Sequence, residues 1–83
     1  MQKKFIVKLG SGIHARPAQK IVEAAQGCSE DIFLVKNGQL YNAKSLLMIL
    51  SMSVKYMEEI EVVTDENNAE CVVEQIGKVL TGE

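Results

Sequence analysis

The sequence predicts an α+β fold in which three helices cover one face of a four-stranded antiparallel sheet, in the order βαββαβα. Short segments with a two-residue apolar period alternate along the chain with segments of helical period. An Asn-Gly pair, the strongest two-residue hairpin signal, joins two of the predicted strands. Most elements also have one polar face, so the three helices can bury their apolar stripes against the same side of the sheet.

The first half of the chain contains a strand, a helix and a hairpin. The strand is predicted at residues 3–9, where Phe5, Val7 and Leu9 share one face. The helix should begin just after His14, because the residues that follow carry an apolar stripe at positions 18, 21, 22 and 25. Gly27 is placed to end it in a left-handed conformation. Strands at 32–36 and 39–43 then flank the Asn-Gly turn.

The second half contains a helix, a strand and a helix. Ser45 is a candidate N-cap for a short helix over residues 46–50, all of which are apolar. Ile60, Val62 and Thr64 alternate in the fourth strand. The last helix has the clearest amphipathic stripe, at residues 69, 72, 73, 76, 79 and 80. No linker or repeat interrupts the order, so we expect one domain over residues 1–83.

Composition excludes several classes of partner and site. Nine basic and eleven acidic residues give a net charge of −2, which argues against nucleic acid. The apolar stretch near the N-terminus is too short for a signal peptide or a membrane span, so we expect a cytoplasmic protein without membrane insertion. Cys28 and Cys71 are expected to be reduced. A metal site is not expected, since Cys28 lies about 20 Å from His14 at helical rise.

The segment GSGIHARPAQK contains the only histidine and the only proline of the chain. If the helix begins after His14, Pro17 lies in its first turn, where the missing N–H costs nothing. The unpaired amides of the helix start, here those of Arg16 and Ala18, then favour an anion beside His14. The guanidinium of Arg16 suits phosphate oxygens, and the glycines allow a partner to approach the backbone. By spacing alone, an ordinary cap or surface residue is the favoured interpretation of His14, with a phosphate-bearing histidine as the alternative.

Two motifs then suggest a family. The segment GIHARPAQ resembles the active-site signature of HPr, the histidine-containing phosphocarrier of the bacterial sugar phosphotransferase system, and AKSLL resembles that family's segment around a regulatory serine. The resemblance implies an open-faced sandwich and a carrier rather than an enzyme. It implies that His14 accepts a phosphoryl group at Nδ1 from enzyme I, ultimately from phosphoenolpyruvate, and passes it to an EIIA component. Arg16 would stabilise the phosphate.

The resemblance also assigns roles to the second helix. Ser45 matches a serine that a dedicated ATP-dependent kinase phosphorylates in many Gram-positive bacteria, although an ordinary N-cap explains it as well. Leu47, Met48, Leu50 and Met52 are expected to form a docking surface for partner proteins, with Ile49 in the core. Packing of the leucines against neighbouring helices is the alternative. We expect a monomer that needs no cofactor.

The chain departs from the family at the second helix and the turn after it. Met48, Ser53 and Met57, with Met52, replace glycines and a leucine of the usual pattern. Such changes should reshape the docking surface, and flexible methionines suit a surface that adapts to several partners. A divergent paralogue is therefore the alternative: a regulatory module that acts through phosphorylation of Ser45 on a transcriptional regulator or metabolic enzyme, with an HPr serine kinase/phosphorylase as its modifier.

Overall fold

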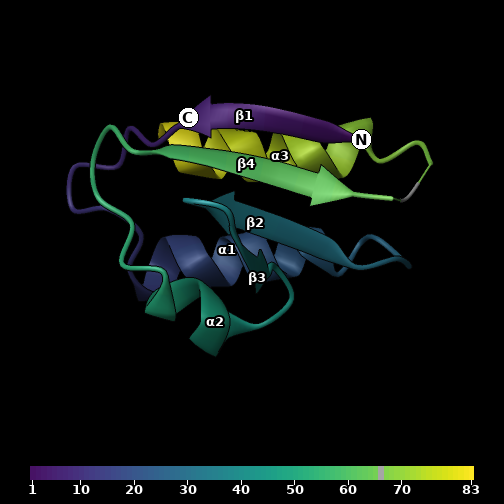
Figure 1. The fold of residues 1–83 in the computed structure, drawn as a ribbon, viewed down its shortest axis with the longest axis horizontal. Coiled ribbons are helices and arrows are strands. Elements are labelled where there is room, and N and C mark those ends of the chain that lie inside the picture. The colour runs from purple at the N-terminus through teal and green to yellow at the C-terminus, as the bar shows by residue number, and fades with distance from the viewer. Residues whose placement is uncertain (66) are drawn as a thin grey trace.

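The computed structural model describes residues 1–65 and 67–83. Its strands are β1 (Gln2–Ile6), β2 (Ile32–Lys36), β3 (Gln39–Asn42) and β4 (Glu59–Thr64), and its helices are α1 (Ala15–Ala25), α2 (Leu46–Ser51) and α3 (Glu70–Thr81). The strands form one antiparallel sheet in the order β1-β4-β2-β3. The helices lie on one side of that sheet and the other side is open (Figure 1). The predicted α+β class and element order are confirmed.

The core lies between the sheet and the helices, as the apolar periods predict. Ile60, Val62 and Thr64 of β4 are buried, and so are Val73, Ile76 and Leu80 of α3. The Asn37-Gly38 turn joins β2 to β3, and both residues have positive φ (51° and 79°), as the tightest hairpin turn requires. α1 contacts both α2 and α3 and so lies between the two other helices.

Two predicted boundaries are wrong. The first strand ends at Ile6 rather than Leu9, because the amide of Lys8 donates to the carbonyl of Leu80 in α3 at 2.9 Å and so leaves the sheet. The prediction of a left-handed Gly27 is also wrong. Positive φ among the described glycines occurs at residues 12, 38 and 82. The chain leaves α1 through tight turns instead, in which the amides of Gly27 and Cys28 donate to the carbonyls of Ala24 and Ala25.

Cys28 is buried and Cys71 is exposed, and the two are not joined by a disulfide. No helix of the described part of the chain is long and apolar enough to cross a bilayer.

Candidate phosphoryl-accepting site

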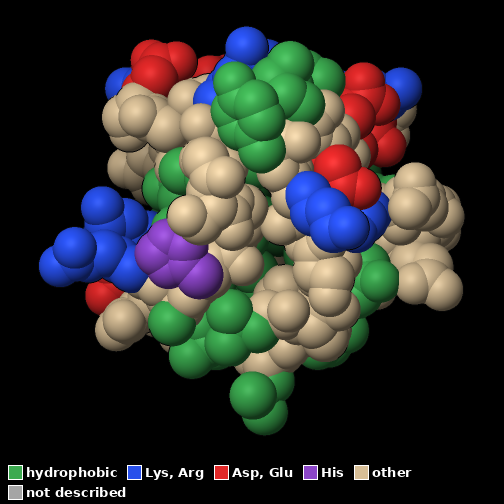
Figure 2. All heavy atoms as spheres, turned by 90° about the vertical axis from the view of Figure 1, so that its left-hand side faces the viewer, with side chains coloured by type: hydrophobic (Ala, Val, Ile, Leu, Met, Phe, Trp, Pro, Cys, Tyr) green, Lys and Arg blue, Asp and Glu red, His purple; other side chains and the backbone are tan. Residues whose placement is uncertain are grey.

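His14 is the N-cap of α1, with extended backbone angles (φ −117°, ψ −170°). Its side chain is exposed and makes no capping hydrogen bond to the helix, so the imidazole is not used to hold the fold together. In Figure 2 the histidine lies at the surface beside a group of basic side-chain atoms, with apolar side chains gathered below it. The sequence prediction that His14 opens the helix is confirmed.

The loop before His14 is fixed by a contact with a distant segment. The amide of Ile13 donates to the carbonyl of Val54 at 3.3 Å, and that of Gly12 donates to Leu9 at 2.9 Å. Gly12 has a φ of 72°, and a Cβ added there would overlap the Val54 carbonyl oxygen. Gly12 is itself buried, so its missing side chain serves this internal contact rather than the approach of a partner. Gly10, in contrast, has open space where a Cβ would lie.

The amides at the start of α1 correct one sequence prediction. The N–H of Ala18 donates to the carbonyl of His14 at 3.0 Å, which is the first hydrogen bond of the helix. Ala18 therefore does not offer a free donor to a phosphate. The N–H groups before it have no acceptor within the helix. Since Pro17 has no N–H, the donors that helix geometry leaves at this end belong to Ala15 and Arg16.

A hollow of about 370 Å³ opens beside His14. We call it the His14 hollow, and it is lined by Leu9, His14, Arg16, Pro17, Lys20, Val79, Gly82 and Glu83. Arg16 was predicted from sequence, whereas Lys20 and Glu83 were missed. Lys20 follows Arg16 by four residues and so shares its face of α1, a spacing that is readable from sequence. Glu83 comes from beyond the end of α3, and nothing in the sequence places it beside His14.

Ser45 caps α2, as predicted. Its Oγ accepts a hydrogen bond from the amide of Met48 at 3.3 Å, and the residue is half-buried. The capping role explains the serine fully in structural terms. Modification of the same hydroxyl would replace this bond by a charged group at the edge of the exposed apolar residues of α2.

The exposed side of α2 is apolar. Leu47 is 79% exposed, and we call it, with the partly exposed Leu46, Met48 and Leu50, the α2 apolar surface. Ile49 points into the core and is fully buried, as predicted. Met52 was predicted on the docking surface and that prediction is wrong. It is 3% exposed, because it lies three residues after Ile49 and therefore on the same inward side of the helix.

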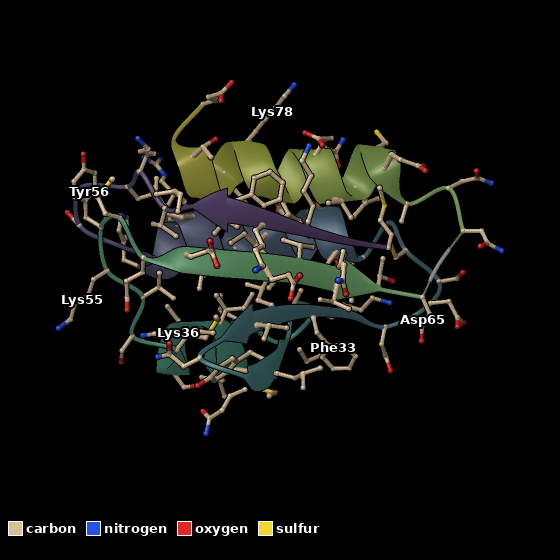
Figure 3. The ribbon with its side chains drawn as sticks, turned by 45° about the horizontal axis from the view of Figure 1, so that its top comes forward. Phe33, Lys36, Lys55, Tyr56, Asp65 and Lys78 are labelled. Carbon is tan, nitrogen blue, oxygen red and sulfur yellow. The ribbon has the colours of Figure 1, made fainter. Side chains whose placement is uncertain are left out.

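Tyr56 and Met57 extend the exposed apolar area, and both are more than half exposed. They belong to residues 52–58, which we call the 52–58 segment. Figure 3 places Tyr56 and Lys55 at the end of the sheet where β4 begins, with Lys36 nearby. Ser53 and Met57 have φ of 54° and 73°, left-handed values that residues with a Cβ rarely adopt. Two of the four departures from the family, Ser53 and Met57, thus fall on positions of unusual backbone.

Lys36 holds the 52–58 segment to the sheet. Its Nζ donates to the carbonyls of Met52 at 2.9 Å and Ser53 at 3.1 Å, and lies 3.3 Å from a carboxylate oxygen of Glu58. Glu58 also accepts a hydrogen bond from the amide of Lys55 at 2.6 Å. This bond is the main cause that lowers the pKa of Glu58 below its usual value; partial desolvation opposes it, and Lys36 contributes in the same direction as the bond.

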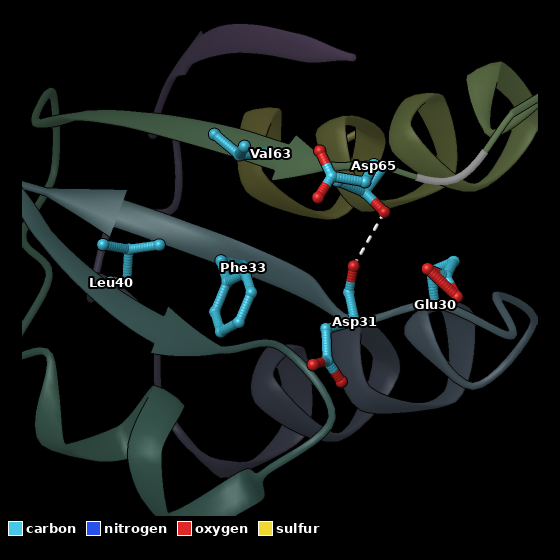
Figure 4. A pocket seen from close by; sticks show the side chains of 7 residues that line it. Glu30, Asp31, Phe33, Leu40, Val63 and Asp65 are labelled. Atoms are coloured by element: carbon cyan, nitrogen blue, oxygen red, sulfur yellow. Dashed lines mark hydrogen bonds between the residues drawn. The ribbon is translucent and has the colours of Figure 1, made fainter.

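A second hollow, of about 260 Å³, lies on the open face of the sheet near the end of β4 (Figure 4). Three carboxylates line it, those of Glu30, Asp31 and Asp65, together with the apolar Phe33, Leu40 and Val63. The hydroxyl of Thr64 donates to the carbonyl of Asp31 at 2.7 Å. Carboxylates repel phosphate, so the His14 hollow is the better match to the predicted chemistry. Among the described residues, no group of three His, Cys, Asp or Glu is arranged to hold a metal ion.

Known proteins share the sequence pattern and the fold of this chain. The family model described as the PTS HPr component phosphorylation site matches residues 1–81. The HPr-like protein Crh of Bacillus subtilis is 32% identical over 76 residues, which cover 92% of this chain and 89% of that protein. A crystal structure of phosphocarrier protein HPr from Bacillus anthracis superposes with a TM-score of 0.86 at 34% identity, and covers 96% of this chain and 95% of its own.

A crystal structure of Bacillus subtilis Crh is also similar, with a TM-score of 0.76 and 30% identity. It covers the whole of this chain and 95% of its own, and it is described as an intertwined dimer formed by domain swapping.

Proposed function

The chain belongs to the HPr family, and we propose that it is a phosphocarrier that accepts a phosphoryl group on His14 from enzyme I and passes it to an EIIA component in the cytoplasm. The observation that carries the proposal is the position of His14. The imidazole is exposed, makes no capping bond, and lines a hollow with the guanidinium of Arg16. A nucleophile that must be reached by two different proteins needs this exposure.

The proposed step is a displacement at phosphorus. The lone pair on Nδ1 of the neutral imidazole attacks the phosphorus atom held by enzyme I, and a new N–P bond forms while the bond to the donor atom breaks. The donor atom keeps the electron pair of that bond. The product anion lies beside Arg16, whose planar guanidinium pairs well with phosphate oxygens, and near the first amides of α1. Transfer to EIIA is the same displacement in reverse, with the partner as nucleophile.

We propose that the α2 apolar surface, together with Tyr56 and Met57, is where both partners dock. An exposed apolar area of this kind is typical of a protein interaction site. It excludes water around the reacting atoms when a partner covers it. Met48 and Met57 supply flexible side chains that adjust to more than one partner shape.

Incubation with enzyme I and phosphoenolpyruvate, followed by intact mass measurement, tests the carrier role. We expect one added phosphate that is lost in acid and absent from the His14→Ala variant. The matched control is Ser45→Ala, which should still accept that phosphate. An unchanged mass with enzymes I from several bacteria, in a chain whose circular dichroism indicates native folding, would refute the proposal.

A second function is favoured by the similarity to Crh and by the place of Ser45 at the edge of the α2 apolar surface. In this role an HPr serine kinase/phosphorylase modifies Ser45, and the added charge, about −2, controls binding to a transcriptional regulator or a metabolic enzyme. Incubation with ATP and such a kinase should add one acid-stable phosphate that Ser45→Ala abolishes and His14→Ala retains. No added mass with an active kinase would contradict this role.

We also propose that the chain acts as one domain and as a monomer. The swapped dimer described for Crh makes the dimer the specific alternative. Light scattering after size exclusion distinguishes the two states, and a stable species of twice the chain mass would overturn the monomer.

A further inference from the structure

We propose that Lys20 is a second cationic ligand for the phosphoryl group on His14. The proposal deepens the proposed function, since it concerns the anion that the carrier would hold. Lys20 lines the His14 hollow together with His14 and Arg16. It lies just outside the GIHARPAQ motif, which contains the residues predicted to bind phosphate.

The helix places the two cations on one face. Lys20 follows Arg16 by four residues, which corresponds to about one turn and a rise of about 6 Å along the helix axis. The side chain of Lys20 is long and flexible, and residues four apart on a helix are neighbours. Its ammonium group is therefore able to move toward an anion at the N-terminal end of α1, where His14 is the N-cap.

Both cations are available. Over residues 1–65 and 67–83, the ion pairs of the structure use Lys3, Lys4 and Lys36 as cations, and neither Arg16 nor Lys20 takes part in one. Both side chains are exposed. No competing carboxylate has to be displaced from Lys20 before it contacts a phosphate.

The charge of the hollow explains why a second cation matters. Of the lining residues, Arg16 and Lys20 are cationic and Glu83 is anionic, which gives 2 − 1 = +1. A phosphoryl group brings a charge of about −2 when fully ionised, so the loaded hollow has about −1. Without Lys20 the corresponding sum is about −2, because Arg16 and Glu83 then cancel. Lys20 thus offsets the repulsion that Glu83 exerts on the phosphoryl group and favours its dianionic form.

The test uses phosphate placed on His14 without any enzyme. Phosphoramidate transfers its phosphoryl group to an imidazole nitrogen and releases ammonia, and this chain has one histidine. A ³¹P NMR titration of the product reports the second ionisation of the phosphoryl group. In Lys20→Gln we expect this pKa to rise by about half a pH unit at low salt, an effect limited by solvent screening, and to shrink at high salt.

Lys78→Gln is the matched control, because it removes the same charge from an exposed lysine of α3 that points away from the molecule (Figure 3). It should leave the titration unchanged, and Lys20→Arg should restore the wild-type value. Equal titrations of wild type and Lys20→Gln would overturn the role of Lys20.

Phosphorylation by enzyme I and the ³¹P NMR titration test different claims. A shifted titration in Lys20→Gln supports the role of Lys20 even if enzyme I never phosphorylates the chain, which would refute the carrier function alone. Phosphorylation by enzyme I combined with an unshifted titration refutes only the role of Lys20.

Discussion

Two turns contact each other at the carbonyl of Val54. Both contain left-handed backbone, but different residue types adopt it. The loop before His14 has a left-handed residue, Gly12, packed against that carbonyl. The 52–58 segment, which supplies the carbonyl, has left-handed residues at Ser53 and Met57. Glycine adopts such a φ without steric cost, whereas a residue with a Cβ is destabilised by about 1–2 kcal/mol.

The two turns differ in whether the left-handed position can accept a side chain. The loop before His14 has no alternative to glycine, because space as well as φ excludes a side chain. In the 52–58 segment the strained positions are exposed, and Met57 adds apolar area beside Tyr56. Strain at such positions is tolerated where the surrounding structure holds the backbone in place. The donor bonds of Lys36 then keep the strained segment in place.

The largest expected effect is that of Gly12→Ala. The new Cβ would require both a left-handed alanine and displacement of the Val54 carbonyl, and we expect a loss of about 3 kcal/mol in the free energy of unfolding. Urea denaturation followed by circular dichroism measures it. Gly10→Ala is the control, since its Cβ meets open space, and it should change stability by less than about 1 kcal/mol. Equal stability of the two variants would contradict the described contact.

The next effect concerns Lys36. Lys36→Met removes the donor to the carbonyls of Met52 and Ser53 and leaves the partly buried bond to Met52 unmade, so we expect a loss of about 2 kcal/mol. Amide hydrogen exchange should accelerate at residues 53–57 more than in α3. Lys4→Met removes a lysine of an exposed, 3.8 Å ion pair and should cost less than about 1 kcal/mol. If both variants lost the same stability, Lys36 would not be the residue that holds the segment.

Met57→Gly is expected to stabilise the fold. Relief of the left-handed φ exceeds the extra backbone entropy of glycine, with a net gain of about 0.5–1 kcal/mol. Tyr56→Gly is the matched control, because Tyr56 is equally exposed but has no positive φ, and it should destabilise the protein. Thermal unfolding measures the melting temperatures of wild type, Met57→Gly and Tyr56→Gly, and we expect Met57→Gly to have the highest and Tyr56→Gly the lowest. A melting temperature of Met57→Gly below that of wild type would mean that the segment is not strained.

Much of the fold was readable from sequence because local patterns determine it. The Asn37-Gly38 turn, the caps at His14 and Ser45 and the alternation in β4 depend on neighbouring residues alone. Two of the errors arise where the outcome depends on exact helix phase. Met52 is buried because α2 turns it inward beside Ile49, and the amide of Ala18 is used because the first helical bond begins there.

The candidate site was predicted only in part, for a similar reason. His14 and Arg16 share one short motif, and Lys20 lies one turn further along the same helix. Glu83 and Val54 reach the site from distant parts of the chain. Only the packing of α3 and of the 52–58 segment brings them there, and no local pattern encodes that packing.

The smallest expected effect is a pH dependence at Glu58. The amide of Lys55, opposed by partial desolvation and supported by Lys36, holds the pKa of this carboxyl below its usual value in the folded protein. The ionised form is therefore favoured by folding. Its stabilising contribution is present above the ordinary pKa of a glutamate and is lost as the pH falls through the lower, folded value.

Glu58→Gln should accordingly flatten the acid side of the stability curve. We expect the melting temperature of the variant to fall less than that of wild type between pH 7 and about pH 3. Glu59→Gln on the neighbouring residue, which contacts Lys4 at 3.8 Å on the exposed face, is the control for the general loss of a carboxylate. If Glu58→Gln and Glu59→Gln gave the same curve, the 52–58 segment would be held by Lys36 through its carbonyl bonds alone. Its stability would then be independent of pH, as we expect for the loop before His14, whose contacts with this segment are between backbone atoms.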